Sequence, residues 1–276
     1  MSGHTARVRA GNDRASLYTE ITDKIIAELE AGRIPWVQPW GTAAIKAPLD
    51  MPRNAATLRG YSGINVLILW GSVIEHGFSG QSWLTFRQAL GLGGHVRKGE
   101  RGTTVVYADR FTPDDERRRA AEAGEEPGAV PFLKRFTVFN TDQCDGLPEG
   151  VAASAVPPPA AYFEPINWHR TAFHELGHWT GQASRLNRDH SGSFGSKSYA
   201  REELVAEMAG AFLCASLGIV PTVRHADYIG SWLEVLREDN RAVVRAASAA
   251  SKATDFLLAF LPPATDSVVE GNEEAA

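Results

Sequence analysis

Cysteine is scarce in this sequence, and long apolar runs are absent. The two cysteines, Cys144 and Cys214, lie far apart in sequence and in different contexts, so they suggest neither a disulfide framework nor a cysteine zinc cluster. There is also no Gly-Lys-Ser/Thr phosphate loop and no Cys/His finger, which argues against NTP hydrolysis and finger-type base reading. No stretch of about 18 apolar residues occurs, and residues 1–16 are polar and basic rather than signal-like. We therefore expect a cytoplasmic protein with no membrane partner.

Charge is distributed unevenly along the chain. The 276 residues have a formal net charge of −5, and 43% of them are apolar, enough for one large domain or two ordinary ones. Residues 1–112 carry 13 Lys and Arg against 9 Asp and Glu, a net charge of +4. Residues 113–276 carry 15 against 24, a net charge of −9. A polyanionic partner would therefore meet the N-terminal part.

Apolar periodicity predicts different regular structure in the two parts of the chain. In the N-terminal part, helices are expected at residues 16–31, 62–76 and 83–90, and strands at residues 103–111 and 132–139. In the C-terminal part, helices alone are expected, at residues 167–180, 200–217, 225–238 and 240–261. The resulting fold class is α+β.

Composition places the domain boundaries. We predict an N-terminal domain at residues 1–147, in which residues 112–131, rich in Asp, Glu, Arg, Ala and Gly, form an exposed insertion between two strands. Residues 148–165 are rich in Pro and Ala, which suits a semi-rigid linker. A C-terminal domain at residues 166–261 and a disordered acidic tail at residues 262–276 complete the prediction.

The strongest chemical signal is the HExxH pattern from His174 to His178, which lies within an expected helix. A spacing of four residues places both imidazoles on one helical face, about 5 to 6 Å apart at Cβ, close enough to hold one zinc ion. Glu175 then lies beside the metal, where a general base for a zinc-bound water is needed.

A second expected helix supplies carboxylates for such a site. It contains Glu202, Glu203 and Glu207, of which the last two are four residues apart and share a face. We predict Glu203 as the third zinc ligand, with Glu207 as an alternative ligand or as a carboxylate that orients a histidine. The competing interpretation is a solvated acidic face. Leu204 and Met208, which follow the two glutamates, place the neighbouring face of the helix in the core. This burial favours the metal site over a solvated acidic face.

The N-terminal part combines cations, aromatic rings and amides that suit contact with nucleic acid. Cations neutralise phosphates, and exposed Trp or Tyr rings stack on unpaired bases at about 1 to 3 kcal/mol each. The Gly-rich segment at residues 93–102 adds flexible backbone amides and three cations. The candidate DNA-binding residues are Arg53, Asn54, Arg59, Tyr61, Asn65, Trp83, Arg87, Gln88, Arg97, Lys98 and Arg101. The competing interpretation places the rings in a core and the charges on an ordinary solvated face.

Several ordered stretches of the chain resemble the ArdC-type antirestriction proteins of plasmids and other mobile elements. They cover most of residues 17–261 and are residues 52–54, 59–67, 83–89, 93–100, 174–181, 185–188, 202–207 and 228–233. The resemblance implies an N-terminal mixed α/β domain that binds single-stranded DNA and a mostly helical, zincin-like metallopeptidase domain. It also implies one Zn²⁺ per chain, held by His174, His178 and a glutamate between Glu202 and Glu207, with Glu175 as the base.

One stretch departs from the family pattern. The family usually has a longer, strand-forming stretch before HExxH, whereas residues 157–170 here pass almost directly from a Pro-rich segment into the helix. A shortened substrate cleft would follow, because in zincins that strand pairs with an extended peptide. The leading hypothesis is an antirestriction protein that binds single-stranded DNA and cleaves a protein or peptide substrate. The alternatives are a non-enzymatic DNA-coating protein whose zincin-like domain is structural or partner-binding, and a peptidase with no DNA role.

Overall fold

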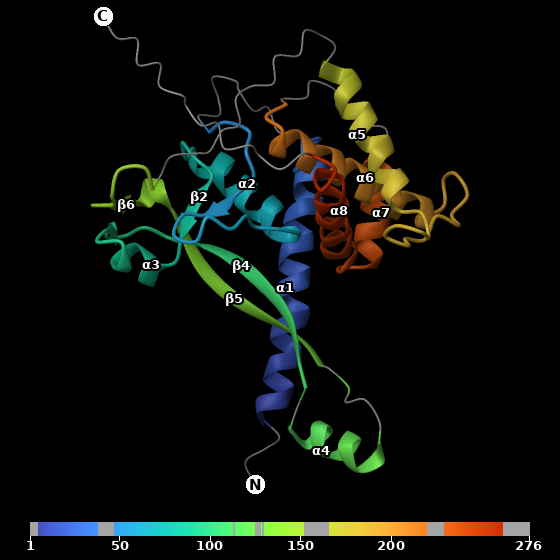
Figure 1. Ribbon diagram of the computed structural model, residues 1–276, viewed down its shortest axis with the longest axis horizontal. Coiled ribbons are helices and arrows are strands. Elements are labelled where there is room, and N and C mark those ends of the chain that lie inside the picture. Colours follow the sequence, from blue (N-terminus) through green and yellow to red (C-terminus); the bar gives the residue numbers. More distant parts are fainter. Residues whose placement is uncertain are drawn as a thin grey trace, which may run out of the picture.

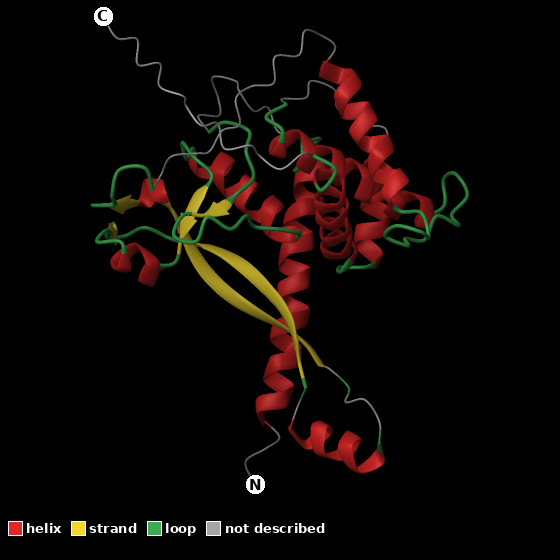
Figure 2. Ribbon diagram, in the orientation of Figure 1, coloured by secondary structure: helices red, strands yellow, loops and turns green. Residues whose placement is uncertain are grey.

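The computed structural model describes residues 5–37, 47–112, 114–124, 128, 130–151, 166–219 and 229–261. Most of the linker predicted at residues 148–165, and the whole tail predicted at residues 262–276, lie outside the described residues. The N-terminal half contains both helices and strands, whereas every regular element described from residue 166 onward is a helix (Figure 2). The predicted α+β fold class is therefore confirmed.

The N-terminal half is built on a small sheet with one long hairpin. Its elements are α1 (Thr5–Glu30), β1 (Arg53–Asn54), α2 (Ile64–His76), β2 (Ser82–Leu84), α3 (Phe86–Gly91), β3 (His95–Val96), β4 (Thr103–Phe111), α4 (Asp114–Ala123), β5 (Val130–Asn140), the 3-10 helix η1 (Thr141–Gln143) and β6 (Cys144–Asp145). The sheet has the order β1-β2-β5-β4, and β3 pairs with β6 separately. The antiparallel strands β4 and β5 extend well beyond the short strands β1 and β2, with α4 near the tip of their hairpin (Figure 1). Helix α4, which belongs to the insertion predicted at residues 112–131, lies at this tip.

The segment predicted as one helix at residues 83–90 is instead a strand followed by a helix. Trp83 lies in β2, where it pairs with Asn140 of β5, and its ring is fully buried against Phe78. Helix α3 begins only after Thr85, whose side chain accepts a hydrogen bond from the backbone N–H of Gln88. The prediction was wrong because it overlooked this capping residue, which marks where a helix begins.

The C-terminal half is a cluster of helices around α6. Its elements are α5 (Ile166–Thr180), α6 (Lys197–Ser216), α7 (Ile229–Glu238) and α8 (Ala242–Leu258). Every residue of α6 from Glu202 to Ala215 is buried, as expected for a helix surrounded by others. Its three glutamates are therefore buried as well, and buried carboxylates need partners. Among the described residues, no helix combines the length and the apolar character needed to cross a membrane.

One continuous hydrophobic core joins the two halves of the chain. Trp36, which follows α1, packs edge-to-face on Trp232 of α7, with ring centroids 5.3 Å apart. Trp70 of α2 makes a similar contact with Phe212 of α6, at 5.7 Å. All four rings are buried, and they belong to a single cluster of apolar residues. The N-terminal and C-terminal halves therefore share their interior.

Candidate functional site

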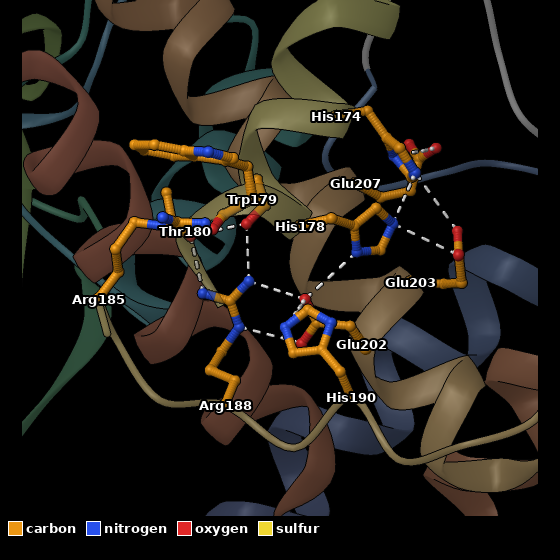
Figure 3. Close-up of polar contacts among 11 residues, drawn as sticks. His174, His178, Trp179, Thr180, Arg185, Arg188, His190, Glu202, Glu203 and Glu207 are labelled. Atoms are coloured by element: carbon orange, nitrogen blue, oxygen red, sulfur yellow. Dashed lines mark hydrogen bonds and ion pairs between the residues drawn. The ribbon is translucent and has the colours of Figure 1, made fainter. Parts of the chain in front are cut away.

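The HExxH residues lie where α5 packs against α6. A Cβ atom built on Gly177 would lie 3.2 Å from the Cα atom of Ala206, which is tighter than ordinary side-chain contacts. Glycine at this position therefore lets the two helices approach closely. The approach brings the histidines of α5 next to the buried glutamates of α6 (Figure 3).

Three side chains converge between α5 and α6 (Figure 3). The Nε2 atoms of His174 and His178 lie 3.1 Å apart, and each lies 3.4 Å from a different carboxylate oxygen of Glu203. These ligand atoms all lie within 4.8 Å of one another. A tetrahedral zinc ion with bonds of about 2.0 to 2.1 Å has ligand atoms about 3.3 Å apart. The spacing of this triad therefore fits a zinc ion.

Each histidine meets a further carboxylate at its other ring nitrogen. The Nδ1 atom of His174 lies 3.3 Å from Oε1 of Glu207, and Nδ1 of His178 lies 3.2 Å from Oε1 of Glu202. A carboxylate at this position fixes the orientation of the ring and leaves Nε2 directed at the metal position. Of the two roles that the sequence left open for Glu207, this geometry favours orientation of a histidine.

Two arginines hold these orienting carboxylates. Arg170 pairs with Glu207, and the side chains of both residues are almost completely buried. Arg188 donates hydrogen bonds to both carboxylate oxygens of Glu202, at 2.7 and 3.0 Å. Neither arginine is among the site residues predicted from the sequence. Helical spacing could have indicated Arg170, which lies four residues before His174, whereas Arg188 comes from a loop to which no periodicity points.

The surrounding carboxylates favour the protonated form of both histidines. Burial acts to lower the pKa of His174, but hydrogen bonds to Glu203 and Glu207 outweigh it and raise this pKa to about 9. Burial also acts to lower the pKa of His178, but hydrogen bonds to Glu202 and Glu203 outweigh it and raise this pKa to about 9. A metal ion that binds to the metal-free protein must therefore displace protons from these histidines.

The triad borders a cavity of about 470 Å³. Glu175 is exposed and lines this cavity. A catalytic zinc site keeps one position open for water or substrate, whereas a structural site is closed by four protein ligands. Three candidate ligands beside a cavity match the open kind of site. The cavity is lined by His174, Glu175, His178, Asp189, His190, Gly192, Ser198, Tyr199, Glu202 and Glu203.

Some of the predicted DNA-binding residues are exposed cations. They are Arg59, Arg87, Arg97, Lys98 and Arg101. Arg97 pairs with Glu100 at 2.8 Å and with Asp145 at 3.5 Å, so its charge is partly offset. The same half also exposes three aromatic residues that are not among the predicted DNA-binding residues, Phe86 (51% exposed), Tyr107 (50%) and Phe136 (45%). No signal in the sequence distinguishes these rings from buried ones.

The remaining DNA-binding candidates stabilise the fold or are partly buried. The side-chain amides of Asn54 and Gln88 bond to each other, and Asn65 bonds to the backbone N–H and C=O of Val106. Trp83 is fully buried, so the prediction that its ring is exposed for stacking on a base is wrong. Arg53 and Tyr61 are partly buried, as are Asn54, Asn65 and Gln88.

Each half of the chain matches a known protein family. Residues 15–139 match the N-terminal domain of anti-restriction factor ArdC, and residues 152–249 match a zincin-like metallopeptidase family. The chain is 34% identical to uncharacterized protein y4eC of Sinorhizobium fredii, over 92% of this chain and 95% of that protein. It is 34% and 35% identical to two DNA primase TraC sequences of Escherichia coli, over 88% and 87% of this chain. The chain spans only 27% and 20% of those primases.

Two solved structures have a similar fold, and both are of the antirestriction ArdC protein from plasmid R388. The metal-free structure has a TM-score of 0.70 at 37% identity, covering 87% of this chain and 96% of that one. The Mn(II)-bound structure has a TM-score of 0.69 at 37% identity, covering 88% and 97%. This chain therefore belongs to the ArdC family of antirestriction proteins, with an ArdC-type N-terminal domain followed by a zincin-like metallopeptidase domain.

Proposed function

We propose that this protein binds single-stranded DNA through its N-terminal half and hydrolyses a protein or peptide substrate at a zinc site in its C-terminal half. In this role it would shield the DNA of a mobile element from restriction. The observation that carries the enzymatic part is the convergence of His174, His178 and Glu203 beside a cavity. The existence of a Mn(II)-bound structure of the R388 protein supports a divalent ion in the family.

The residues at the cavity suit hydrolysis of an amide bond. A zinc ion bound there would lower the pKa of a water molecule and polarise a peptide carbonyl. His174, His178 and Glu203 would hold the ion. The carboxylate of Glu175, which lines the cavity, would accept a proton from the attacking water and deliver it to the leaving amine.

Zinc titration of the metal-free protein tests the proposed site. We expect one zinc ion per chain, measured by mass spectrometry of metal content after unbound metal is removed. Mn²⁺ is expected to bind at the same stoichiometry, because a site of two histidines and a carboxylate accepts other divalent ions. A protein that retains no metal would contradict the enzymatic part of the proposal and leave the DNA-binding part.

The proposed DNA surface centres on α3 and the segment that follows it. Arg87, Lys98 and Arg101 are exposed there, and the ring of Phe86 is 51% exposed beside Arg87 in the sequence. Proteins that bind single strands without sequence preference combine cations for the phosphates with aromatic rings for the bases. This arrangement, rather than the buried ring of Trp83, supports the assignment.

Replacing Lys98 and Arg101 together with alanine is expected to weaken binding of a single-stranded oligonucleotide roughly tenfold at about 0.1 M salt. The slope of log K against log salt should fall by about 1.4, because each phosphate contact on a single strand contributes about 0.7. Fluorescence anisotropy with a labelled oligonucleotide measures both quantities. The matched control replaces Arg201 and Lys252, two exposed cations of the C-terminal half. An equal loss in both double variants would contradict this placement of the surface.

A further inference from the structure

Glu202 links α5, α6 and the loop between them. Its Oε1 atom lies 3.2 Å from Nδ1 of His178 and accepts a hydrogen bond of 2.7 Å from Arg188 (Figure 3). Its Oε2 atom accepts a second hydrogen bond from Arg188, at 3.0 Å. The side chains of Glu202 and Arg188 are only 10% and 12% exposed. A two-point contact between a guanidinium and a carboxylate fixes both the position and the angle of the carboxylate.

The guanidinium group of Arg188 also caps the C-terminal end of α5. It donates hydrogen bonds to the carbonyl oxygen of Gly177, at 2.7 Å, and to the hydroxyl oxygen of Thr180, at 2.8 Å. Carbonyl groups in the last turn of a helix have no partner within the helix, so these contacts stabilise the helix end. Arg188 therefore connects the helix that carries His178 to the carboxylate that orients its ring.

The loop reaches this position through a turn at Asn187. This residue has a φ of 48°, in the left-handed region that asparagine tolerates better than most residues. The backbone N–H of the next residue, Arg188, donates to the carbonyl of Gly181 at 2.8 Å. Residues 185–188, one of the stretches that resemble the ArdC family, thus fold back against the helix end.

We propose that Arg188 is a positioning residue of the metal site, which acts through Glu202 to hold the Nε2 atom of His178 toward the metal. The inference rests on the proposed zinc site. Without Arg188, the buried carboxylate of Glu202 would lose its cationic partner and would be free to turn toward His190, whose Nε2 atom lies 3.6 Å from its Oε1 atom. The ring of His178 would then lose its fixed orientation, and zinc affinity would fall.

A double-mutant cycle on Arg188 and Glu202 tests this inference. Arg188→Ala is expected to weaken zinc binding by about 10- to 100-fold, as is usual when a partner of a metal ligand is lost. Glu202→Gln is expected to have a similar effect, and the double variant should bind zinc no more weakly than Glu202→Gln alone. Competition with a chromophoric chelator measures the affinities, on metal-free proteins whose circular dichroism matches the wild type.

If Arg188→Ala does not fold, Arg188→Lys takes its place, because lysine keeps the charge without the two-point contact. This variant is expected to bind zinc about tenfold more weakly than the wild type.

Thr180→Val removes one of the contacts that Arg188 makes with the end of α5 and keeps its bond to the carbonyl of Gly177. This variant removes the hydroxyl contact at the end of α5 and leaves the pair with Glu202, so zinc affinity should stay within about twofold of the wild type. Additive losses in the double variant, or an equal loss in Thr180→Val, would overturn the inference, because Arg188 would then act only as a helix cap. Failure of the wild type to bind zinc would overturn the proposed site itself and the inference with it.

Discussion

Replacing His174 with alanine is expected to reduce zinc affinity by about two to three orders of magnitude. Structural zinc sites with four protein ligands gain about 10 to 16 kcal/mol in total, or roughly 2.5 to 4 kcal/mol per ligand, which corresponds to about two to three orders of magnitude in affinity. The substitution also removes the imidazole that contacts the buried carboxylate of Glu207 and one of the two that contact Glu203. Chelator competition gives the affinity, and metal content after dialysis gives an independent measure.

The matched control for this change is His169→Ala. His169 lies on the same helix but outside the triad, so its loss should leave zinc affinity unchanged. Unaltered zinc binding by His174→Ala, with the control also unaltered, would mean that zinc is held elsewhere in the chain. The geometry of α5 and α6 would then carry no metal function.

Replacing Glu175 with glutamine is expected to retain zinc and to lower the rate of peptide hydrolysis by about 10²- to 10⁴-fold. Glutamine has nearly the same shape but cannot accept a proton from water, and loss of a general base has an effect of this size. Cleavage of a library of quenched fluorescent peptides measures the rate. Glu122→Gln, at an exposed position of α4 far from the triad in sequence, is the control for the change in charge.

The same variant separates the enzymatic hypothesis from a DNA-coating protein. If shielding of DNA from restriction requires cleavage of a protein, Glu175→Gln should lose both hydrolysis and protection. Full protection by a variant that cannot cleave peptides would rule out a necessary role for catalysis. The metal site would then stabilise the fold or a partner contact.

Much of the metal site could be predicted from helical spacing alone. HExxH indicated two candidate ligands and a candidate base, because residues four apart share a helical face. Spacing could not choose between Glu203 and Glu207, since both lie on one face of α6. The choice depends on how α5 and α6 pack, which places Glu203 at the Nε2 atoms of both histidines and Glu207 at the other nitrogen of His174.

The N-terminal half was predicted less completely. The strand at residues 103–111 agrees with β4, because a run of β-branched and aromatic residues is a strong local signal. Burial depends on contacts between distant segments, so the sequence could not indicate that Trp83 points into the core while Phe86 points outward.

The contact between Trp36 and Trp232 links the stability of the N-terminal half to that of the C-terminal half. Because one core spans both halves, they are expected to share a single unfolding equilibrium. A ligand that binds only the folded chain stabilises all of it, wherever it binds. A zinc ion near α6 would thus slow proteolysis that requires unfolding of the shared core, and bound DNA would slow loss of the metal through unfolding. Such mutual protection requires no contact between the two sites and no change of shape.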